Sequence, residues 1–202
     1  MGLVRTVAPT VNPVTRAEAS AWCKVPADIT ADNDLIDALV LSAVDRCERV
    51  AGRSLITQTW RLTLDSFTDA EAQRAGLLWW DVGKGWWVIE LPRPPLIAVS
   101  SLAYVDTAGD SQTLGSTLYQ VDAEHEPGRV MPAHGQVWPS TRSQTRNAVT
   151  ITWTAGYGAA ASSVPAEIKD RLRAYIAYCY EHREGPDEDL LDRLFRHFWY
   201  GG

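Results

Sequence analysis

The sequence predicts an α+β fold: a helical bundle formed by the N- and C-terminal helices, with an inserted antiparallel β-rich region. Apolar residues recur at helical spacing near both ends of the chain. Between these segments the hydrophobic period changes to the two-residue alternation of strands, and glycine or proline separates the runs. The expected divisions are a flexible lead-in at 1–14, a helical body at 15–54 and 163–185, a β-rich insertion at 55–162, and a C-terminal aromatic helix or tail at 186–202.

Two helices are expected after the lead-in, which contains two prolines and no periodic pattern. Thr15 and Glu18 have the spacing of a capping box and predict a short helix that ends near Cys23. A second helix is expected to end at Gly52, which has the place of a left-handed C-terminal cap. Its apolar stripe comprises Leu35, Ile36, Leu39, Val40, Ala43, Val44, Cys47 and Val50.

The insertion is interpreted as a series of short strands. Trp60, Leu62 and Leu64 alternate with polar residues, which is typical of a half-buried strand. Residues 106–110 predict a hairpin loop with its glycine in the left-handed conformation. The clearest strand is expected at 148–157, and its apolar face comprises Val149, Ile151, Trp153 and Ala155.

The C-terminal region predicts two further helices. Pro165 is a favourable first helical residue, and Gly185-Pro186 would end this helix and begin another. The apolar stripe of the first helix is formed by Ile168, Leu172, Ile176 and Cys179, and that of the second by Leu190, Leu191, Leu194, Phe195, Phe198 and Trp199. Two interpretations of the second stripe stay open: docking into a groove of a larger partner, or packing on the helix at 165–184.

Charge and composition exclude several classes of protein. The chain has 19 basic and 25 acidic residues and a net charge of −6, which is unsuited to gripping nucleic acid over the whole surface. No apolar run approaches the ~20 residues that span a bilayer, and no segment resembles a signal peptide, so neither a membrane protein nor secretion is expected. Cys23, Cys47 and Cys179 are odd in number and far apart, which favours reduced thiols.

No catalytic, cofactor-binding or metal-binding residue is predicted. The sequence lacks a nucleophile elbow, a phosphate-binding P-loop, an H-E-x-x-H motif and paired C-x-x-C motifs. One alternative stays open, a small metal- or thiol-dependent enzyme that uses Cys179, His182 and His197. His125 and His134 flank a turn without an accompanying ligand pattern, so we interpret them as exposed loop residues.

Tryptophan is unusually frequent, with nine in 202 residues, and four of them lie on the two arms of one predicted hairpin with a glycine-rich tip. Adjacent residues on a strand point to opposite faces, so a core can bury only one of each pair. The others are either covered within the chain or contact a partner, since aromatic side chains are enriched at interfaces. The residues of this hypothetical partner-contact hairpin are Trp79, Trp80, Trp86 and Trp87.

Six stretches follow one another in a characteristic order along residues 15–185. They are Asp34–Leu39 at the start of a helix, Gly52–Trp60 turning into a strand, Leu91–Leu96, Gly128–Val130, Trp138–Ser140, and Val149–Gly158 before Val164-Pro165. Together these stretches resemble the head–tail connector (adaptor) proteins of long-tailed bacteriophages and of phage-like gene transfer agents. The tryptophan hairpin and the final helix lie outside the matching pattern.

The resemblance implies a structural virion protein and not an enzyme. Adaptors of this family form a ring of about twelve copies between the portal and the next neck or tail protein. The implied partners are therefore the portal protein, a stopper or other neck or tail protein, and further copies of the chain, with DNA passing non-specifically through the lumen and no cofactor. The implied location is the neck of a virion or phage-like particle made in the bacterial cytoplasm. The alternative is another neck component, such as a stopper or head-completion protein.

The resemblance implies the portal as a partner, and the apolar stripe of the final segment is predicted to be the surface that docks onto it. The apolar stripe of the final segment provides five large side chains, and burying each one contributes ~1.5–3 kcal/mol. An acidic subunit repeated around a ring would in addition give an acidic lumen that lets DNA pass rather than holds it. The predicted portal-docking residues are Leu191, Leu194, Phe195, Phe198 and Trp199.

Overall fold

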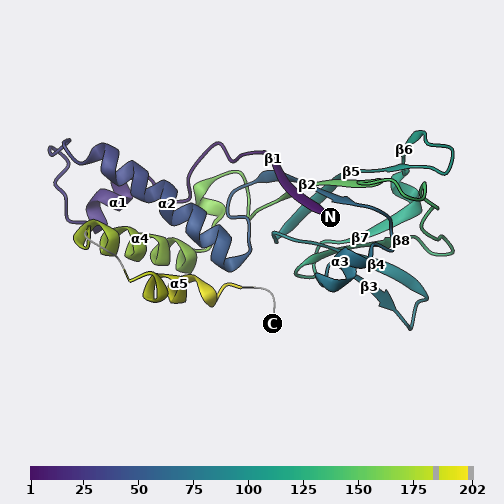
Figure 1. Ribbon diagram of the computed structural model, residues 1–202. Coiled ribbons are helices and arrows are strands. Elements are labelled where there is room, and N and C mark those ends of the chain that lie inside the picture. Colours follow the sequence, from purple (N-terminus) through teal and green to yellow (C-terminus); the bar gives the residue numbers. More distant parts are fainter. Residues whose placement is uncertain (184–186, 200–202) are drawn as a thin grey trace. The chain divides into compact units, whose positions relative to one another are not determined.

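The computed structural model describes residues 1–183 and 187–199 (Figure 1). These residues form five α-helices, two short 3-10 helices and nine strands, so the predicted α+β class is confirmed. Within these ranges, no helix combines the length and the apolar character needed to cross a bilayer.

The chain divides into two compact units, and each is built from segments that are distant in sequence. The β unit comprises Met1–Ala8 and Gln58–Ala155. The helical unit comprises Pro9–Thr57 and the residues from Gly156 onward. Neither unit is therefore one continuous piece of the chain.

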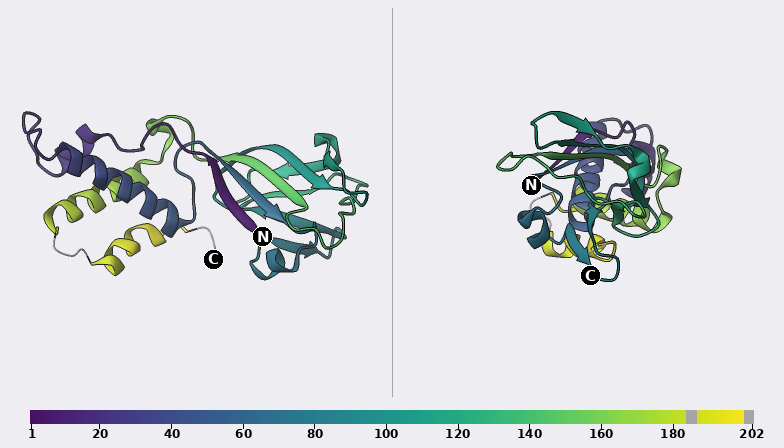
Figure 2. Two further views of the ribbon diagram at one scale, coloured as in Figure 1. Left: turned by 45° about the horizontal axis from the view of Figure 1, so that its top comes forward. Right: turned by 90° about the vertical axis from the view of Figure 1, so that its right-hand side faces the viewer.

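The β unit contains two antiparallel sheets around one hydrophobic core (Figures 1 and 2). One sheet has the strand order β1-β2-β9-β5-β6, and the other has the order β3-β4-β8-β7. The strands are β1 (Gly2–Val7), β2 (Gln58–Leu64), β3 (Leu78–Asp81), β4 (Trp86–Leu91), β5 (Leu96–Val105), β6 (Ser111–Thr113), β7 (Tyr119–Asp122), β8 (Gly128–Pro132) and β9 (Val149–Ala155). A short helix, α3 (Ala70–Arg74), lies between β2 and β3 in sequence.

The alternation predicted for two of these strands is confirmed. Every second residue of β2 and of β9 is buried in the core, and Leu62 of β2 pairs in register with Ile151 of β9. The predicted hairpin loop at 106–110 joins β5 to β6, with Gly109 at φ +102°. This backbone conformation favours glycine, and the side chain of Arg142 lies beside it.

The first strand corrects the expectation of a flexible lead-in over 1–14. Gly2–Val7 form β1, which pairs antiparallel with β2 and places Leu3 against the core. Its last four residues are all exposed, so buried and exposed positions do not alternate along the strand. An edge strand of this kind depends on backbone hydrogen bonds to its neighbour, which no local pattern reveals.

The helical unit contains α1 (Arg16–Trp22), α2 (Asn33–Ala51), α4 (Ala166–Glu181) and α5 (Glu188–Arg196). The four helices share one hydrophobic core. Helix α4 runs antiparallel to α2, whereas α5 runs parallel to it (Figure 2). The fully buried members of this core include Ala19, Ile36, Cys47, Leu172, Ile176 and Phe195.

The ends of these helices agree with most of the expected caps. Thr15 and Glu18 form the predicted capping box, and Gly52 is left-handed at φ +68°. Pro165 was expected as the first helical residue but precedes the helix as its N-cap, because its ψ of 138° is extended. The predicted stop and start at Gly185-Pro186 lies outside the described residues.

The boundary between the units differs in detail from the expected insertion. Leu55 and Ile56, which were expected to open the insertion, are buried in the core of the helical unit. At the other boundary, Gly156 has φ +131°, and a Cβ there would lie 2.6 Å from the carbonyl group of Ile56. The insertion begins at Gln58 of β2 and ends at Ala155 of β9. These two residues pair with each other, so the chain enters and leaves the insertion at adjacent points.

Candidate docking surfaces

The predicted tryptophan hairpin is present as β3 and β4. Its turn is closed by the carboxylate of Asp81, which accepts hydrogen bonds from the backbone N–H groups of Gly83 and Lys84 at 3.0 and 3.1 Å. The register places Trp80 opposite Trp87. Strand β3 is at the edge of its sheet, so the backbone groups on one side of the hairpin have no neighbouring strand in that sheet.

The four tryptophans of the hairpin differ in exposure. Trp80 is 46% exposed, and its ring meets Trp87 edge-on with ring centroids 5.5 Å apart. Trp79, Trp86 and Trp87 are half-buried, and the indole N–H of Trp79 donates to Glu90 at 3.1 Å. The chain itself therefore covers much of three indoles. The surface of the hairpin that is accessible to a partner consists of Trp80 and the exposed tip.

The final helix turns one face of its apolar stripe toward the core of the helical unit. Phe195 is fully buried there, and Leu194 and Phe198 are partly buried against the same core. Trp199 is 58% exposed. The side chain of Leu191 lies outside the described residues. Packing within the chain thus explains why position 195 is apolar. Among the described residues of the stripe, Trp199 is the most accessible to a partner.

Polar contacts also hold α5 along α2. Arg46 and Asp192 form an ion pair with Nε and Oδ1 2.7 Å apart, and their side chains are only 13% and 23% exposed. Further along, Arg53 Nε donates to the backbone carbonyl of Phe198 at 2.5 Å. The helix is therefore attached to its own unit by charged as well as apolar contacts.

The residues of the alternative enzyme interpretation occupy different surroundings. Cys179 is buried, and burial raises the pKa of its thiol, which opposes formation of a nucleophilic thiolate. His182 stacks on Tyr178 with ring centroids 4.2 Å apart, and the His197 ring lies 5.6 Å from that of Phe198. In residues 1–183 and 187–199, no three or more His, Cys, Asp or Glu side chains form a group that would hold a metal ion.

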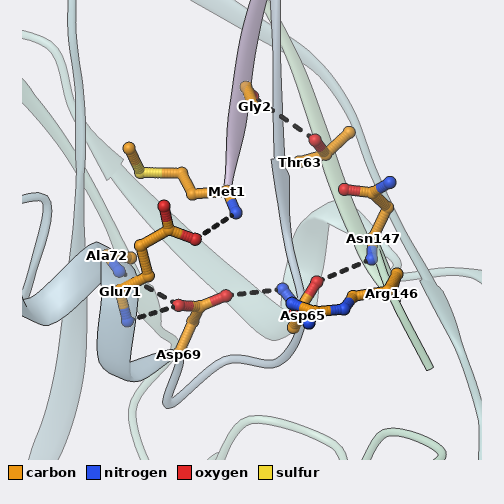
Figure 3. Close-up of polar contacts among 9 residues, drawn as sticks. All are labelled: Met1, Gly2, Thr63, Asp65, Asp69, Glu71, Ala72, Arg146 and Asn147. Carbon is orange, nitrogen blue, oxygen red and sulfur yellow. Dashed lines mark hydrogen bonds and ion pairs between the residues drawn. The ribbon is translucent and has the colours of Figure 1, made fainter. Parts of the chain in front are cut away.

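A network of carboxylates joins segments of the β unit (Figure 3). Asp69 is buried and accepts hydrogen bonds from the backbone N–H groups of Asp65, Glu71 and Ala72 at 2.7, 2.8 and 3.0 Å. Burial alone would raise the pKa of Asp69, but these three donors lower it below its usual range. Glu71 in turn accepts from the amino group of Met1 at 2.8 Å. The network fixes the start of α3 beside β1 and β2.

The loop that joins β8 to β9 is attached to the same network. Asp65 accepts hydrogen bonds from the backbone N–H of Asn147 at 2.9 Å and from Arg146 Nη1 at 2.8 Å (Figure 3). The Asn147 bond, followed by the Arg146 contact, lowers the pKa of Asp65, so this carboxylate stays ionised near neutral pH. An open polar hollow of about 620 Å³ adjoins it, lined by Asp65, Ser66 and residues 141–146.

The sequence patterns did not predict this hollow. One signal was present, because the chain has no Asp or Glu from residue 127 to residue 166 although it carries 25 acidic residues in total. The position of Asp65 beside the loop depends on contacts between residues about 80 positions apart, which sequence spacing does not show.

Comparison with known proteins gives matches of fold only. The sequence matches no known protein-family profile and no curated protein. In a structure described as the neck of an empty GTA particle, computed with C6 symmetry, one chain matches with a TM-score of 0.75 and 22% identity over 100% of this chain and 99% of that chain. A chain in the virion of a native gene transfer agent particle matches with a TM-score of 0.72 and 22% identity over the same shares.

A third structure, the neck of a native GTA particle computed with C12 symmetry, matches with a TM-score of 0.68 and 21% identity over 100% of this chain and 99% of that chain. The resemblance predicted from the sequence is therefore confirmed at the level of the fold. The matches extend over both the β unit and the helical unit, so the likeness is not to one common domain alone.

Proposed function

We propose that the chain is a structural subunit of the neck of a phage-like particle, where it acts as the head–tail adaptor. The observation that carries this proposal is the match of fold over the whole chain to proteins in gene transfer agent particles, two of them described as necks. The order of the sequence stretches that resemble adaptors supports the finer assignment among neck components.

In this proposal the subunit is one of a ring of about twelve copies through which DNA passes. The C6 and C12 symmetry used for the neighbouring necks supports a ring. Each subunit carries a net charge of −6, so the assembled ring is strongly acidic. Such a ring repels the phosphate backbone as a whole, which allows DNA to slide through without a tight overall grip.

The helical unit docks onto the portal through the exposed part of the α5 stripe. Trp199 provides the main anchor, and the partly buried Leu194 and Phe198 extend the contact. Tryptophan is enriched among residues that dominate binding energy at interfaces. Phe195 contributes indirectly, because its burial holds α5 in place.

The tryptophan hairpin contacts the next neck or tail protein through Trp80. This side chain is nearly half exposed on an edge strand, beside a hairpin tip at which Val82 is 87% exposed. An exposed aromatic ring provides apolar area, and the edge of a sheet offers a place where a partner strand can add by backbone hydrogen bonds.

The experiment is complementation in cells that make the particle. Loss of the chain should give DNA-filled heads without tails, and the wild-type chain should restore tails. Trp199→Ala should leave a folded subunit that binds purified portal more weakly by about 2 kcal/mol or more. Trp80→Ala should keep portal binding and lose the next neck protein. Trp22→Ala, at a similarly exposed tryptophan of the helical unit, is the matched control and should retain both contacts.

Two results would contradict parts of this proposal separately. Tailed, infectious particles formed in the absence of the chain would exclude the adaptor role. Unchanged portal affinity in Trp199→Ala would remove the portal assignment of α5 but not the place of the subunit in the neck, which cryo-electron microscopy of the particle decides directly.

A further inference from the structure

A long loop with no helix or strand of its own, residues 133–148, joins β8 to β9. Connections longer than about 12–15 residues are uncommon in compact domains, and the ordered ones usually have a function. This loop is positioned by Trp138, which stacks on Phe67 with ring centroids 4.7 Å apart. The indole N–H of Trp138 also donates to the carbonyl of Trp87 at 2.8 Å. The loop is therefore held against the β core rather than left free.

The outer part of this loop has the composition of a phosphate-contacting surface. Residues 139–147 read PSTRSQTRN, with two arginines, several hydroxyls and two amides but no carboxylate. Arginine, serine, threonine, asparagine and glutamine are the side chains that contact phosphate oxygens of nucleic acids. The loop lies within the 40-residue stretch, 127–166, that contains no acidic residue.

The two arginines border the polar hollow of about 620 Å³. Arg142 is exposed and forms no ion pair with any carboxylate in the described ranges of the chain. The side chain of Arg146 is 86% exposed although it pairs with Asp65, so its guanidinium remains accessible to solvent. A guanidinium presents donors in a planar fork that fits phosphate oxygens.

The nearby carboxylates are occupied by local hydrogen bonds. Asp65 accepts from Asn147 and Arg146, as described above. Asp106 lies in the turn whose Gly109 touches the Arg142 side chain, and it accepts from three backbone N–H groups and one side-chain amide. Two arginines against one lining carboxylate leave the hollow with a net positive charge, in contrast to the chain as a whole.

The backbone of the loop is held in an unusual conformation at two positions. Gln144 has φ +57° and Asn147 has φ +54°, a region that non-glycine residues adopt at a cost in free energy. Such conformations persist where surrounding contacts impose them, and they occur preferentially at binding sites. One of the two residues, Asn147, is held by the hydrogen bond from its N–H to Asp65.

We propose that this hollow binds phosphate groups of the backbone of double-stranded DNA, with Arg142 and Arg146 as the contacting cations. The inference rests on the proposed function, in which DNA passes the subunit. The contacts are to phosphates and not to bases, so binding does not depend on sequence. A single hollow binds DNA phosphates weakly. In the proposed ring each subunit contributes one hollow, so DNA meets several weak contacts that form and break easily, although the lumen as a whole repels it.

The test measures binding of short, fluorescently labelled duplexes to the full-length chain by anisotropy, from about 50 to 200 mM salt. Two duplexes of unrelated sequence should bind the wild-type chain equally. Arg142→Gln with Arg146→Gln should weaken binding about tenfold or more and reduce the salt dependence by about one unit of log–log slope for each arginine. Arg61→Gln and Lys84→Gln make the same charge change at exposed sites elsewhere in the β unit and should change affinity less than about twofold.

The single variant Arg142→Gln keeps the test interpretable if loss of the Arg146–Asp65 pair disturbs the fold, because Arg142 has no such pair. Equal losses in the loop variants and the two controls would overturn the proposal, since they would show only general electrostatics. Wild-type binding that is insensitive to both loop variants would overturn it as well.

Two further probes separate the possible sources of negative charge. Inorganic phosphate should compete with the duplex only at high concentration, because it lacks neighbouring phosphates. Saturable binding of phosphate alone, without duplex binding, would show an ion site and overturn the proposal. Binding of poly-glutamate with the same arginine dependence would show a surface for an acidic protein and overturn it too. Incorporation of the chain into the neck is measured independently, so failure of the proposed function would be recognised separately.

Discussion

The ring of Phe195 packs against the ring of Tyr175, with centroids 5.8 Å apart and planes inclined at 36°. Phe195 is fully buried, and Tyr175 is almost fully buried. This contact joins α5 to α4, so part of the apolar stripe that could have served a partner instead stabilises the helical unit. In the proposed function, stability therefore depends on Phe195 of α5, whereas portal binding depends mainly on Trp199, which follows the helix.

Phe195→Ala should lower the free energy of unfolding by about 3–5 kcal/mol, because it leaves a cavity in the core. Trp199→Ala should change it by less than about 1 kcal/mol, since Trp199 is mostly exposed. Chemical denaturation followed by far-ultraviolet circular dichroism measures both. Equal stability of the two variants would show that α5 is not part of the folded core.

The Arg46–Asp192 ion pair should contribute to the attachment of α5. A double-mutant cycle with Arg46→Ala and Asp192→Ala is expected to give a coupling energy of about 1 kcal/mol or more, because both side chains are largely buried. The exposed pair of Arg171 and Glu167, 4.0 Å apart on α4, provides the matched control and should give less than about 0.5 kcal/mol. A coupling no larger than that of the control pair would argue against tight docking of α5.

Glu18 should make stability depend on acidity at low pH. The backbone N–H of Thr15 donates to its carboxylate at 2.8 Å and, with Arg173 at 2.5 Å, lowers its pKa from 4.5 to about 2. A carboxyl with a lowered pKa in the folded state stabilises the fold above its unfolded pKa and loses that contribution as the pH falls toward the folded value. The stabilisation is thus present at neutral pH and disappears between about pH 4.5 and pH 2.

Glu18→Gln should therefore cost about 1–2 kcal/mol at pH 7, allowing for solvent screening of a side chain that is one-third exposed. The difference from wild type should shrink as the pH is lowered below about 4.5. Urea titrations at a series of pH values test this, with the exposed Glu167→Gln as the control. A difference that stays constant down to pH 2 would contradict the assignment.

Trp80 should be the most quenchable tryptophan of the hairpin. Iodide reaches exposed indoles, so Trp80→Phe should remove an accessible component of the fluorescence, whereas Trp153→Phe, at a fully buried position, should not. Collisional quenching of each variant measures the accessible fraction. The same quenching profile in both variants would show that Trp80 is shielded in the free subunit.

Most of the secondary structure could be predicted from the sequence, because the relevant forces act over a few residues. The capping box at Thr15, the left-handed Gly52 and the alternation along β2 and β9 all depend on near neighbours and on which face is apolar. The hairpin around Trp80 and Trp87 was predictable for the same reason.

Other features required contacts between residues far apart in the chain. Strand β1 exists because β2 offers it backbone partners, and its own residues show no pattern that would identify it. Sequence spacing also could not decide which hairpin indoles stay accessible. That depends on Glu90, which binds Trp79, and on Trp138, which reaches the hairpin from a loop 51 residues away from Trp87.

The surroundings of the final helix and the formation of the polar hollow likewise depend on contacts between distant residues. The periodicity of α5 fixed that it would have an apolar face, but only the position of Tyr175 on α4 determined that Phe195 is covered by its own unit. Asp65 and Arg146 are 81 residues apart, and the strands between them bring them to 2.8 Å. Local sequence specifies which faces of a helix or strand are apolar and must be buried. Which surface buries them depends on the fold of the whole chain, because hydrophobic burial is non-directional and any suitably placed apolar surface satisfies it.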